Sequence, residues 1–426
     1  MRITGILIKN VDIVDIGVHK TADIYIKNGL ICEIAENISP ENNDVKVIDA
    51  KGLTAMPALM DMHVHFRDPG FTYKEDIVTG ASAAAAGGFT AVACMPNTKP
   101  AIDNVDTINY ITTKARNTGV RVYPVGCITK KMKGDELCDY KMLKRAGAVA
   151  LSDDGKPVKN AEIMRRALEK ADENDMLVIS HCEDLKIINK GIMHKGAVSE
   201  LLGVPGMDRA SEDTITAREI ILANSVNSRV HIAHVSTAGS IDIIRYAKHK
   251  GVKVTCETCP HYFMLTHEKL MTRDADYRMN PPLREESDRE AVLQGIIDGT
   301  VDCIVTDHAP HAPEEKENFR EAPNGVVGLE TSLAAVLTAL YHTDTVPLER
   351  IVELMSVNPR KLLNLPVEKI KTGFPANIVL ADLNKEWIVD PSKLHSKSHN
   401  TVFKGMTLKG KPVMTISNGN IIYSEI

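Results

Sequence analysis

The sequence predicts an α/β protein in which a TIM-type (β/α)8 barrel is joined by a small β-sandwich domain built from both chain ends. Short apolar runs alternate with longer helical patterns through the middle of the chain, and eight such units over about 250 residues match the size of this barrel. Both ends instead contain short alternating strands with Asn-Gly turns, which are typical of β-hairpins. We therefore expect the barrel at residues 55–370 and the two parts of the sandwich at 1–54 and 371–426.

The predicted barrel elements follow one another in a strand–helix order that favours a parallel sheet with crossover helices. The apolar runs expected to form strands are residues 58–66, 87–95, 121–129, 147–154, 176–183, 229–236, 253–260 and 302–310. Amphipathic patterns predict helices, among others, at 75–86, 107–117, 162–174 and 241–249. The connection after the last strand, residues 308–329, is unusually long, and long connections in compact domains are usually functional.

The composition excludes several classes of protein. The net charge is −5 and no basic block is present, which argues against a nucleic-acid-binding surface. No apolar run approaches the roughly 18 residues that span a bilayer, and the first residues lack a cleavable signal, so we expect a cytoplasmic protein. The eight cysteines are then expected to be reduced thiols. The single Cys256–Cys259 pair lacks the second pair of a structural zinc site and is interpreted as core.

Residues of the types that bind metals lie at the ends of five separate predicted strands. Because the carboxyl ends of barrel strands meet around one mouth, we expect these residues to converge there. The residues are His63 and His65 at the end of the first strand, Asp153 and Asp154 at the end of the fourth, His181 in the fifth, His234 in the sixth and Asp307 in the eighth.

This set predicts a pair of metal ions. His63 and His65 are two apart on a strand, so both side chains point to the same face and can hold one ion. Asp307 can reach that ion because the first and eighth strands are neighbours, and His181 and His234 can hold a second ion. Imidazole and carboxylate ligands suit zinc, cobalt or manganese. Two such ions about 3.5–4 Å apart can share a hydroxide.

Each piece alone has an ordinary structural interpretation. A single strand histidine is more often a core or surface group, and an acidic pair before Gly155 is usually a turn. An anion should bridge the two ions, and we favour Asp154 over Asp153 for it because Asp154 ends the apolar run. His308 should point away from the metals if its strand stays extended. The remaining histidines, including His194, His249, His267 and His342, are expected to be solvated.

Longer motifs resemble the class I dihydroorotases, the long bacterial and archaeal type within the amidohydrolase superfamily, over essentially the whole chain. They are DMHVHFRDPG at 61–70, MPNT at 95–98, SDDG at 152–155, ETCPHY at 257–262, NPPLR at 280–284 and TDHAPH at 306–311. Many relatives carry a carboxylated lysine as the bridging anion, but residues 147–154 contain no lysine. The long bacterial dihydroorotases have an aspartate there, which selects Asp154 and counts against a hydantoinase or an allantoinase.

The resemblance implies a reaction and a metal centre. Dihydroorotases catalyse the reversible cyclisation of N-carbamoyl-L-aspartate to L-dihydroorotate and water in de novo pyrimidine (UMP) biosynthesis. The implied centre is two Zn²⁺ ions per chain with a bridging hydroxide, and Asp307 is expected to shuttle the proton. The implied metal ligands are His63, His65, Asp154, His181, His234 and Asp307.

The substrate carries a carboxylate away from the reacting carbon. Arg67 shares a face with His65 and can hold this carboxylate through a bidentate contact, although an ion pair with Asp68 or Asp61 is the ordinary alternative. Further substrate contacts are expected from Asn97 and His311 and, by resemblance, from Asn280 and from the backbone around Asn324 and Gly325.

Two other functions compete with this one. The first is another cyclic amide hydrolase, similar to a hydantoinase or an allantoinase. The second is a non-catalytic barrel that serves as a partner of aspartate transcarbamoylase; such a scaffold would lose metal ligands, whereas this chain keeps all of them. The resemblance also implies a homo-oligomer, with a dimer favoured, and admits association with aspartate transcarbamoylase.

Overall fold

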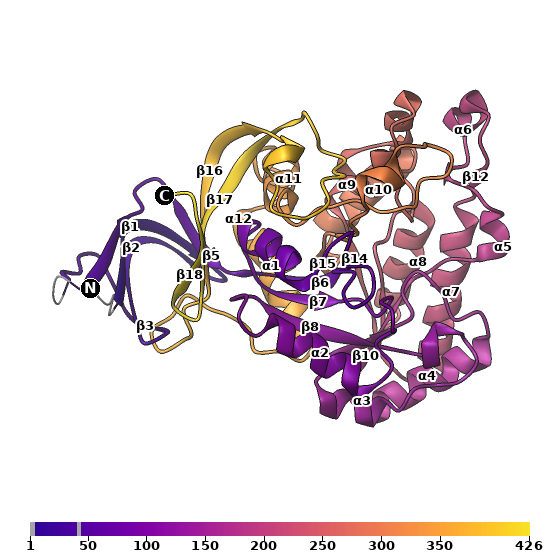
Figure 1. Ribbon diagram of the computed structural model, residues 1–426, viewed down its shortest axis with the longest axis horizontal. Coiled ribbons are helices and arrows are strands. Elements are labelled where there is room, and N and C mark those ends of the chain that lie inside the picture. Colours follow the sequence, from indigo (N-terminus) through magenta and orange to yellow (C-terminus); the bar gives the residue numbers. More distant parts are fainter. Residues whose placement is uncertain (1–4, 41–43) are drawn as a thin grey trace.

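Two large β-sheets organise residues 5–40 and 44–426, the part of the chain that this computed structural model describes. One sheet is the barrel, and the other joins the two chain ends. Figure 1 shows the second sheet on one side, beside both termini, and the helices of the barrel on the other side. The predicted fold class is confirmed.

The barrel contains eight parallel strands that are hydrogen-bonded in the order of the sequence. They are β6 (Leu59–Val64), β7 (Phe89–Cys94), β8 (Arg121–Cys127), β9 (Ala150–Ser152), β10 (Leu177–Ser180), β13 (Val230–Ile232), β14 (Val254–Thr258) and β15 (Cys303–Ile304). The ring closes where Val64 forms a parallel bridge with His308. Each strand lies inside its predicted run but is shorter, because the polar residues at the end of the run leave the ladder at the mouth.

Helices cover the outside of the barrel and begin at sequence-encoded caps. The side chain of Asp76, for example, accepts hydrogen bonds from the N–H groups of Val78 and Thr79 at the start of α1 (Ile77–Ala86), donors that a first helical turn leaves free. The other α-helices are α2 (Val105–Ala115), α3 (Tyr140–Ala146), α4 (Ala161–Glu173), α5 (Leu185–Ile188), α6 (Ala197–Leu202), α7 (Ala210–Ser225), α8 (Ala238–His249), α9 (Pro260–Met264), α10 (Glu286–Ile297), α11 (Ser332–Val336), α12 (Leu348–Val352) and α13 (Asn358–Leu362). No helix in the described part of the chain is both long and apolar enough to cross a membrane.

The connection between β15 and α11 is long, as predicted. Its one regular element is the short 3₁₀ helix η4 (Pro313–Lys316). It lies at the mouth of the barrel, because the His308 end of the connection pairs both with Val64 and with Val326. The two ends of this loop are therefore held next to the first barrel strand.

The chain ends build one β-domain, which confirms the prediction that they pair. The strand order is β18-β17-β16-β5-β1-β2-β3, and β4 pairs with β1 on a branch. Hydrogen bonds run through all of these strands, so the domain is a single mixed sheet around its own apolar core. The strands are β1 (Gly5–Asp15), β2 (Val18–Lys27), β3 (Leu30–Ala35), β4 (Val45–Asp49), β5 (Thr54–Pro57), β16 (Ile378–Ile388), β17 (Thr407–Ser417) and β18 (Asn420–Ser424).

Four of the remaining histidines are buried and not solvated as expected, and His231 and His261 are only 0% and 3% exposed. His194 and His267 were expected to be solvated, but they are only 1% and 7% exposed, so this prediction is wrong. The chain after β10 folds back as the small sheet of β11 (Met193–His194) and β12 (Gly206–Met207), and this brings His194 against Arg284. The cysteines agree with the prediction, because all are free and all except Cys32 are buried.

Candidate metal centre

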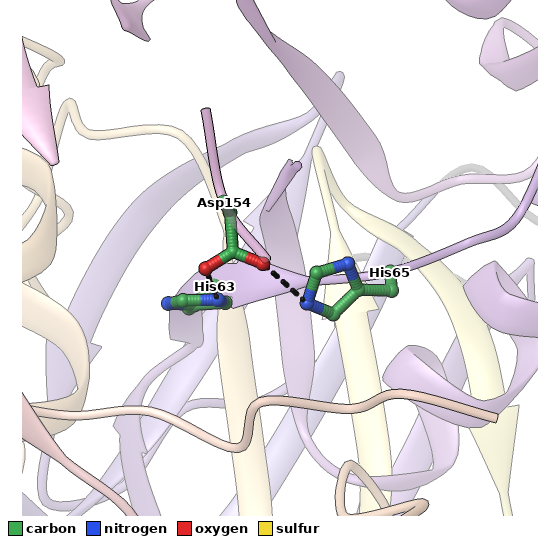
Figure 2. Close-up of side chains that lie close together, drawn as sticks. All are labelled: His63, His65 and Asp154. Atoms are coloured by element: carbon green, nitrogen blue, oxygen red, sulfur yellow. Dashed lines mark ion pairs between the residues drawn. The ribbon is translucent and has the colours of Figure 1, made fainter. Parts of the chain in front are cut away.

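His63 and His65 face one carboxylate at the mouth of the barrel. The Nε2 atom of His63 lies 3.4 Å from Oδ1 of Asp154, and the Nε2 atom of His65 lies 3.3 Å from Oδ2. Figure 2 shows the Asp154 carboxylate between the two rings. His63 lies on β6 and His65 directly follows this strand, and their two-residue spacing turns both rings inward, as the strand period requires.

The same carboxylate also faces the second pair of histidines. Oδ1 of Asp154 lies 3.4 Å from Nδ1 of His181 and 3.6 Å from Nε2 of His234. These two nitrogen atoms are 2.9 Å apart. Asp154 therefore belongs to two groups of ligand atoms, each compact enough to hold one metal ion.

Asp307, which follows the last barrel strand β15, completes the cluster. Its Oδ1 atom lies 3.1 Å from Nε2 of His65 and 3.7 Å from Nε2 of His63. The six residues expected to converge are thus within one buried cluster, although they lie at or just beyond the ends of five different strands.

The electrostatics and the donor set fit transition-metal ions. Burial opposes ionisation of Asp154, but His63, His181 and His234 overcome it and lower the pKa of this carboxyl well below its usual value. Nε2 of His63 and Oδ1 of Asp154 are buried and accept or donate no hydrogen bond within the described structure. Buried polar atoms without partners are costly, and imidazole with carboxylate is a typical donor set for divalent transition metals.

Asp153 lies next to Asp154 in sequence but points elsewhere. Its Oδ1 atom accepts hydrogen bonds from the N–H groups of Ile128 and Thr129 at 2.9 and 3.1 Å. Burial raises the pKa of Asp153 to about 7, against the opposing effect of these hydrogen bonds. Asp153 therefore fastens β8 to β9, while Asp154 enters the cluster.

Glu257 is a part of the site that the sequence reasoning did not assign. Its Oε1 atom lies 2.5 Å from Nδ1 of His63, and its Oε2 atom lies 3.2 Å from Nε2 of His231. Burial opposes ionisation here too, but the two histidines lower the pKa of Glu257 to about 2. Such a carboxylate fixes the ring so that Nε2 faces the cluster. Glu257 could have been found from the sequence, because it lies near the end of a predicted strand, as the six cluster residues do.

Arg67 carries a positive charge that no carboxylate neutralises directly. Its Nε donates to the carbonyl of Pro310 at 3.2 Å, and no ion pair forms with any described carboxylate. The alternative prediction, an ion pair of Arg67 with Asp68 or Asp61, is wrong. Asp68 pairs with Lys114 at 2.6 Å, and Asp61 accepts hydrogen bonds from backbone N–H groups. The guanidinium is therefore available for an anion at the mouth.

His311 lies beside Arg67, whose Nη2 is 3.4 Å from its Nε2, and shorter contacts with Lys74 and Asn324 favour one tautomer of its ring. Lys74 Nζ is 3.2 Å from its Nδ1, and the carbonyl of Asn324 is 2.9 Å from its Nε2. A lysine ammonium can only donate, so Nδ1 accepts and Nε2–H donates to that carbonyl. Burial and the nearby cations Arg67, Lys316 and Lys74 hold the pKa of His311 far below its usual value, so the ring is neutral.

The other expected substrate residues lie around the same mouth. Asn97 contacts Nδ1 of His65 through its side-chain oxygen at 2.8 Å, so it orients the imidazole of this candidate metal ligand. Asn280 donates to Glu183 at 2.7 Å, and Glu183 lies 3.4 Å from His181. Gly325 approaches His311 closely enough that an added Cβ would lie 2.9 Å from Nε2. His308 points away from the cluster toward Glu75, as predicted.

Comparison with known proteins gives consistent results. The dihydro-orotase-like family profile matches residues 52–240. A protein of Trichlorobacter lovleyi named dihydroorotase is 49% identical over 99% of this chain and 99% of its own length. A protein of Acetivibrio thermocellus with the same name is 49% identical over 95% of each chain.

Solved structures of similar fold include hydantoinases and dihydropyrimidinases. The L-hydantoinase of Arthrobacter aurescens superposes with a TM-score of 0.88 at 24% identity, over 99% of this chain and 96% of that one. A dihydropyrimidinase of Brevibacillus agri superposes with a TM-score of 0.85 at 22% identity, over 99% and 95% of the two chains. At this level of identity the likeness establishes the barrel and its β-domain.

Proposed function

The chain belongs to the dihydroorotase family, and from this membership we propose that it catalyses the reversible cyclisation of N-carbamoyl-L-aspartate to L-dihydroorotate and water. The observation that carries the proposal is the unpaired guanidinium of Arg67 beside His311, at the rim of the buried histidine–aspartate cluster. N-carbamoyl-L-aspartate and L-dihydroorotate both have a carboxylate apart from the reacting group, and Arg67 offers a cation for that carboxylate.

We infer that the cluster holds two divalent ions, with zinc as the expected metal. His63, His65 and Asp307 would hold one ion, His181 and His234 the other, and Asp154 would serve both. Such a pair would supply a bound water of lowered pKa and a Lewis acid for the amide carbonyl. Glu257 and Asn97 support this assignment because they direct Nε2 of His63 and of His65 into the cluster.

Asp307 is the residue that we assign to proton transfer. In ring opening, its carboxylate accepts the proton of the attacking water, the ring C–N bond breaks, and Asp307 returns the proton to the departing nitrogen. In ring closure it takes a proton from the attacking carbamoyl nitrogen and gives it to the departing hydroxyl, which leaves as water. Burial opposes ionisation, but His65, His63 and His234 lower the pKa of Asp307, so the carboxylate is ionised and ready to accept.

Arg67→Gln is expected to raise KM for L-dihydroorotate by about 10- to 100-fold and to change kcat little. The reason is that a charge-assisted hydrogen bond contributes about 1.5–3 kcal/mol, and each 1.4 kcal/mol is tenfold. Steady-state kinetics measure both constants. Arg320→Gln, at an exposed position in the long connection that carries His311, is the matched arginine control and should leave KM unchanged. An unchanged KM in Arg67→Gln would remove the carboxylate assignment.

The proposal as a whole is tested with the purified protein. We expect zinc-loaded protein to hydrolyse L-dihydroorotate, but not hydantoin or allantoin, and to contain about two metal ions per chain. Dialysis against a chelator should abolish turnover, and added zinc should restore it. Turnover of hydantoin or allantoin instead would indicate another cyclic amide hydrolase. Absence of both metal and turnover would favour a non-catalytic scaffold.

A further inference from the structure

We propose that Asn400 is a positioning residue for the carboxylate-binding side of the active site, a role that rests on the function proposed above. Asn400 lies in residues 395–404, a part of the connection between β16 and β17 that we call the strap. The strap comes from the C-terminal part of the chain, yet it lies across the loops that follow the first and last barrel strands. The strap fixes the positions of the loops that carry Arg67 and His311 relative to each other.

Asn400 binds both ends of the long connection at once. Its Oδ1 atom accepts a hydrogen bond from the N–H of His311 at 3.1 Å, and its Nδ2 donates to the carbonyl of Gly325 at 2.9 Å. Its own carbonyl accepts from the N–H of Val327 at 3.0 Å. The side chain is only 6% exposed. One buried residue thus joins two points of the loop that are far apart along the chain.

The rest of the strap holds the loop that carries Arg67 and Lys74. Ser398 Oγ donates to the carbonyl of Lys74 at 2.6 Å. Lys397 donates from Nζ to the carbonyl of Thr72 at 2.7 Å, and the hydroxyl of Ser396 donates to the buried carboxylate of Glu75. The strap therefore contacts the loop after β6 and the loop after β15 together.

These contacts meet at the imidazole of His311. The strap holds the backbone of His311 through Asn400, and it holds the backbone of Lys74, whose ammonium fixes the tautomer of the ring. Gly325 lies against the same ring with no space for a side chain. A shift at either end would move the His311 ring relative to Arg67. The hydrogen bonds of Asn400 do not involve the histidine–aspartate cluster. A change at Asn400 should therefore alter substrate affinity and leave metal binding unchanged.

The first test is Asn400→Ala, measured by kinetics and metal analysis. We expect KM for L-dihydroorotate to rise by roughly tenfold, kcat to stay within about threefold and metal content to be unchanged, since two neutral hydrogen bonds are lost. The matched control is Asn377→Ala. Asn377 is equally buried and accepts a hydrogen bond from the N–H of Asn418 within the β-domain, so KM should not change. An unchanged KM in Asn400→Ala, or an equal rise in both variants, would overturn the proposal.

The second test is residue-resolved hydrogen exchange, which does not depend on the substrate. In Asn400→Ala, the amide of His311 loses its acceptor and should exchange at least tenfold faster than in the unmodified protein. Asn400→Asp keeps an acceptor at this position, so protection of the His311 amide should be retained. Unchanged exchange in Asn400→Ala would overturn the positioning role.

The two tests also separate this inference from the proposed function. If the unmodified protein fails to hydrolyse L-dihydroorotate, the proposed function is wrong, while hydrogen exchange still tests whether Asn400 orders the loop. If the unmodified protein is active and exchange at His311 is unaffected by Asn400→Ala, the function stands and the inference fails.

Discussion

Asp307→Asn is expected to lower kcat for L-dihydroorotate by about 10²- to 10⁴-fold, the usual contribution of a positioned acid–base group. An asparagine has the same shape and can still offer an oxygen to a metal ion, but it cannot accept a proton. Fold and metal content should therefore be retained while turnover is lost. Steady-state kinetics, metal analysis and thermal unfolding on the same sample measure the three properties.

The matched control for this change is Asp153→Asn. Asp153 is also buried, but it accepts hydrogen bonds from the backbone of β8 and lies outside the cluster. Its oxygen acceptor survives in asparagine, so kcat should stay within a fewfold of the unmodified protein. Near-normal turnover in Asp307→Asn would remove Asp307 from proton transfer, whatever its role as a ligand.

Asp154→Asn is expected to have the largest effect on metal binding. We predict that metal content falls from about two ions to one or fewer per chain, with loss of turnover, because a shared anion reduces the repulsion between two adjacent cations. Asp154 is the residue that reaches both groups of histidines, so no neighbouring carboxylate can replace it in both. Elemental analysis after dialysis, together with kinetics, measures the effect.

Asp153→Asn is again the matched control, because it makes the same chemical change at the neighbouring aspartate, which lies outside the cluster. It should keep its metals and change mainly the thermal stability. Retention of both ions in Asp154→Asn would show that the cluster does not use Asp154 as a shared ligand. Loss of metal in Asp153→Asn alone would exchange the two roles and contradict the geometry.

The gathering of the six cluster residues could be predicted because it follows from a simple rule of barrel geometry. The residues lie at the ends of predicted strands, and parallel barrel strands all present those ends at one mouth. The rule does not depend on exact boundaries: β15 spans only Cys303–Ile304, well inside the predicted run, yet Asp307 still reaches His65. The same rule, applied to the strand that ends near Glu257, would have included that residue.

Other features could not be predicted from one sequence because they depend on contacts between distant segments. His194 is buried only because the chain after β10 folds back against Arg284. Arg67 is free because Asp68 pairs with Lys114, a residue on the second helix. Asn400 has no local pattern that distinguishes it from any other polar loop residue. In each case the partner is set by how separate elements pack and not by neighbours along the chain.

By itself, the sequence determined the α/β barrel, the pairing of the two chain ends and the set of residues at the barrel mouth. These follow from local periodicity and from strand ends, which are properties of short segments. Only the tertiary structure determined that Glu257 orients His63, that Arg67 has no carboxylate partner and that Asn400 holds the loops. Those depend on side-chain directions and on long-range hydrogen bonds, which exist only once the barrel and the β-domain have packed together.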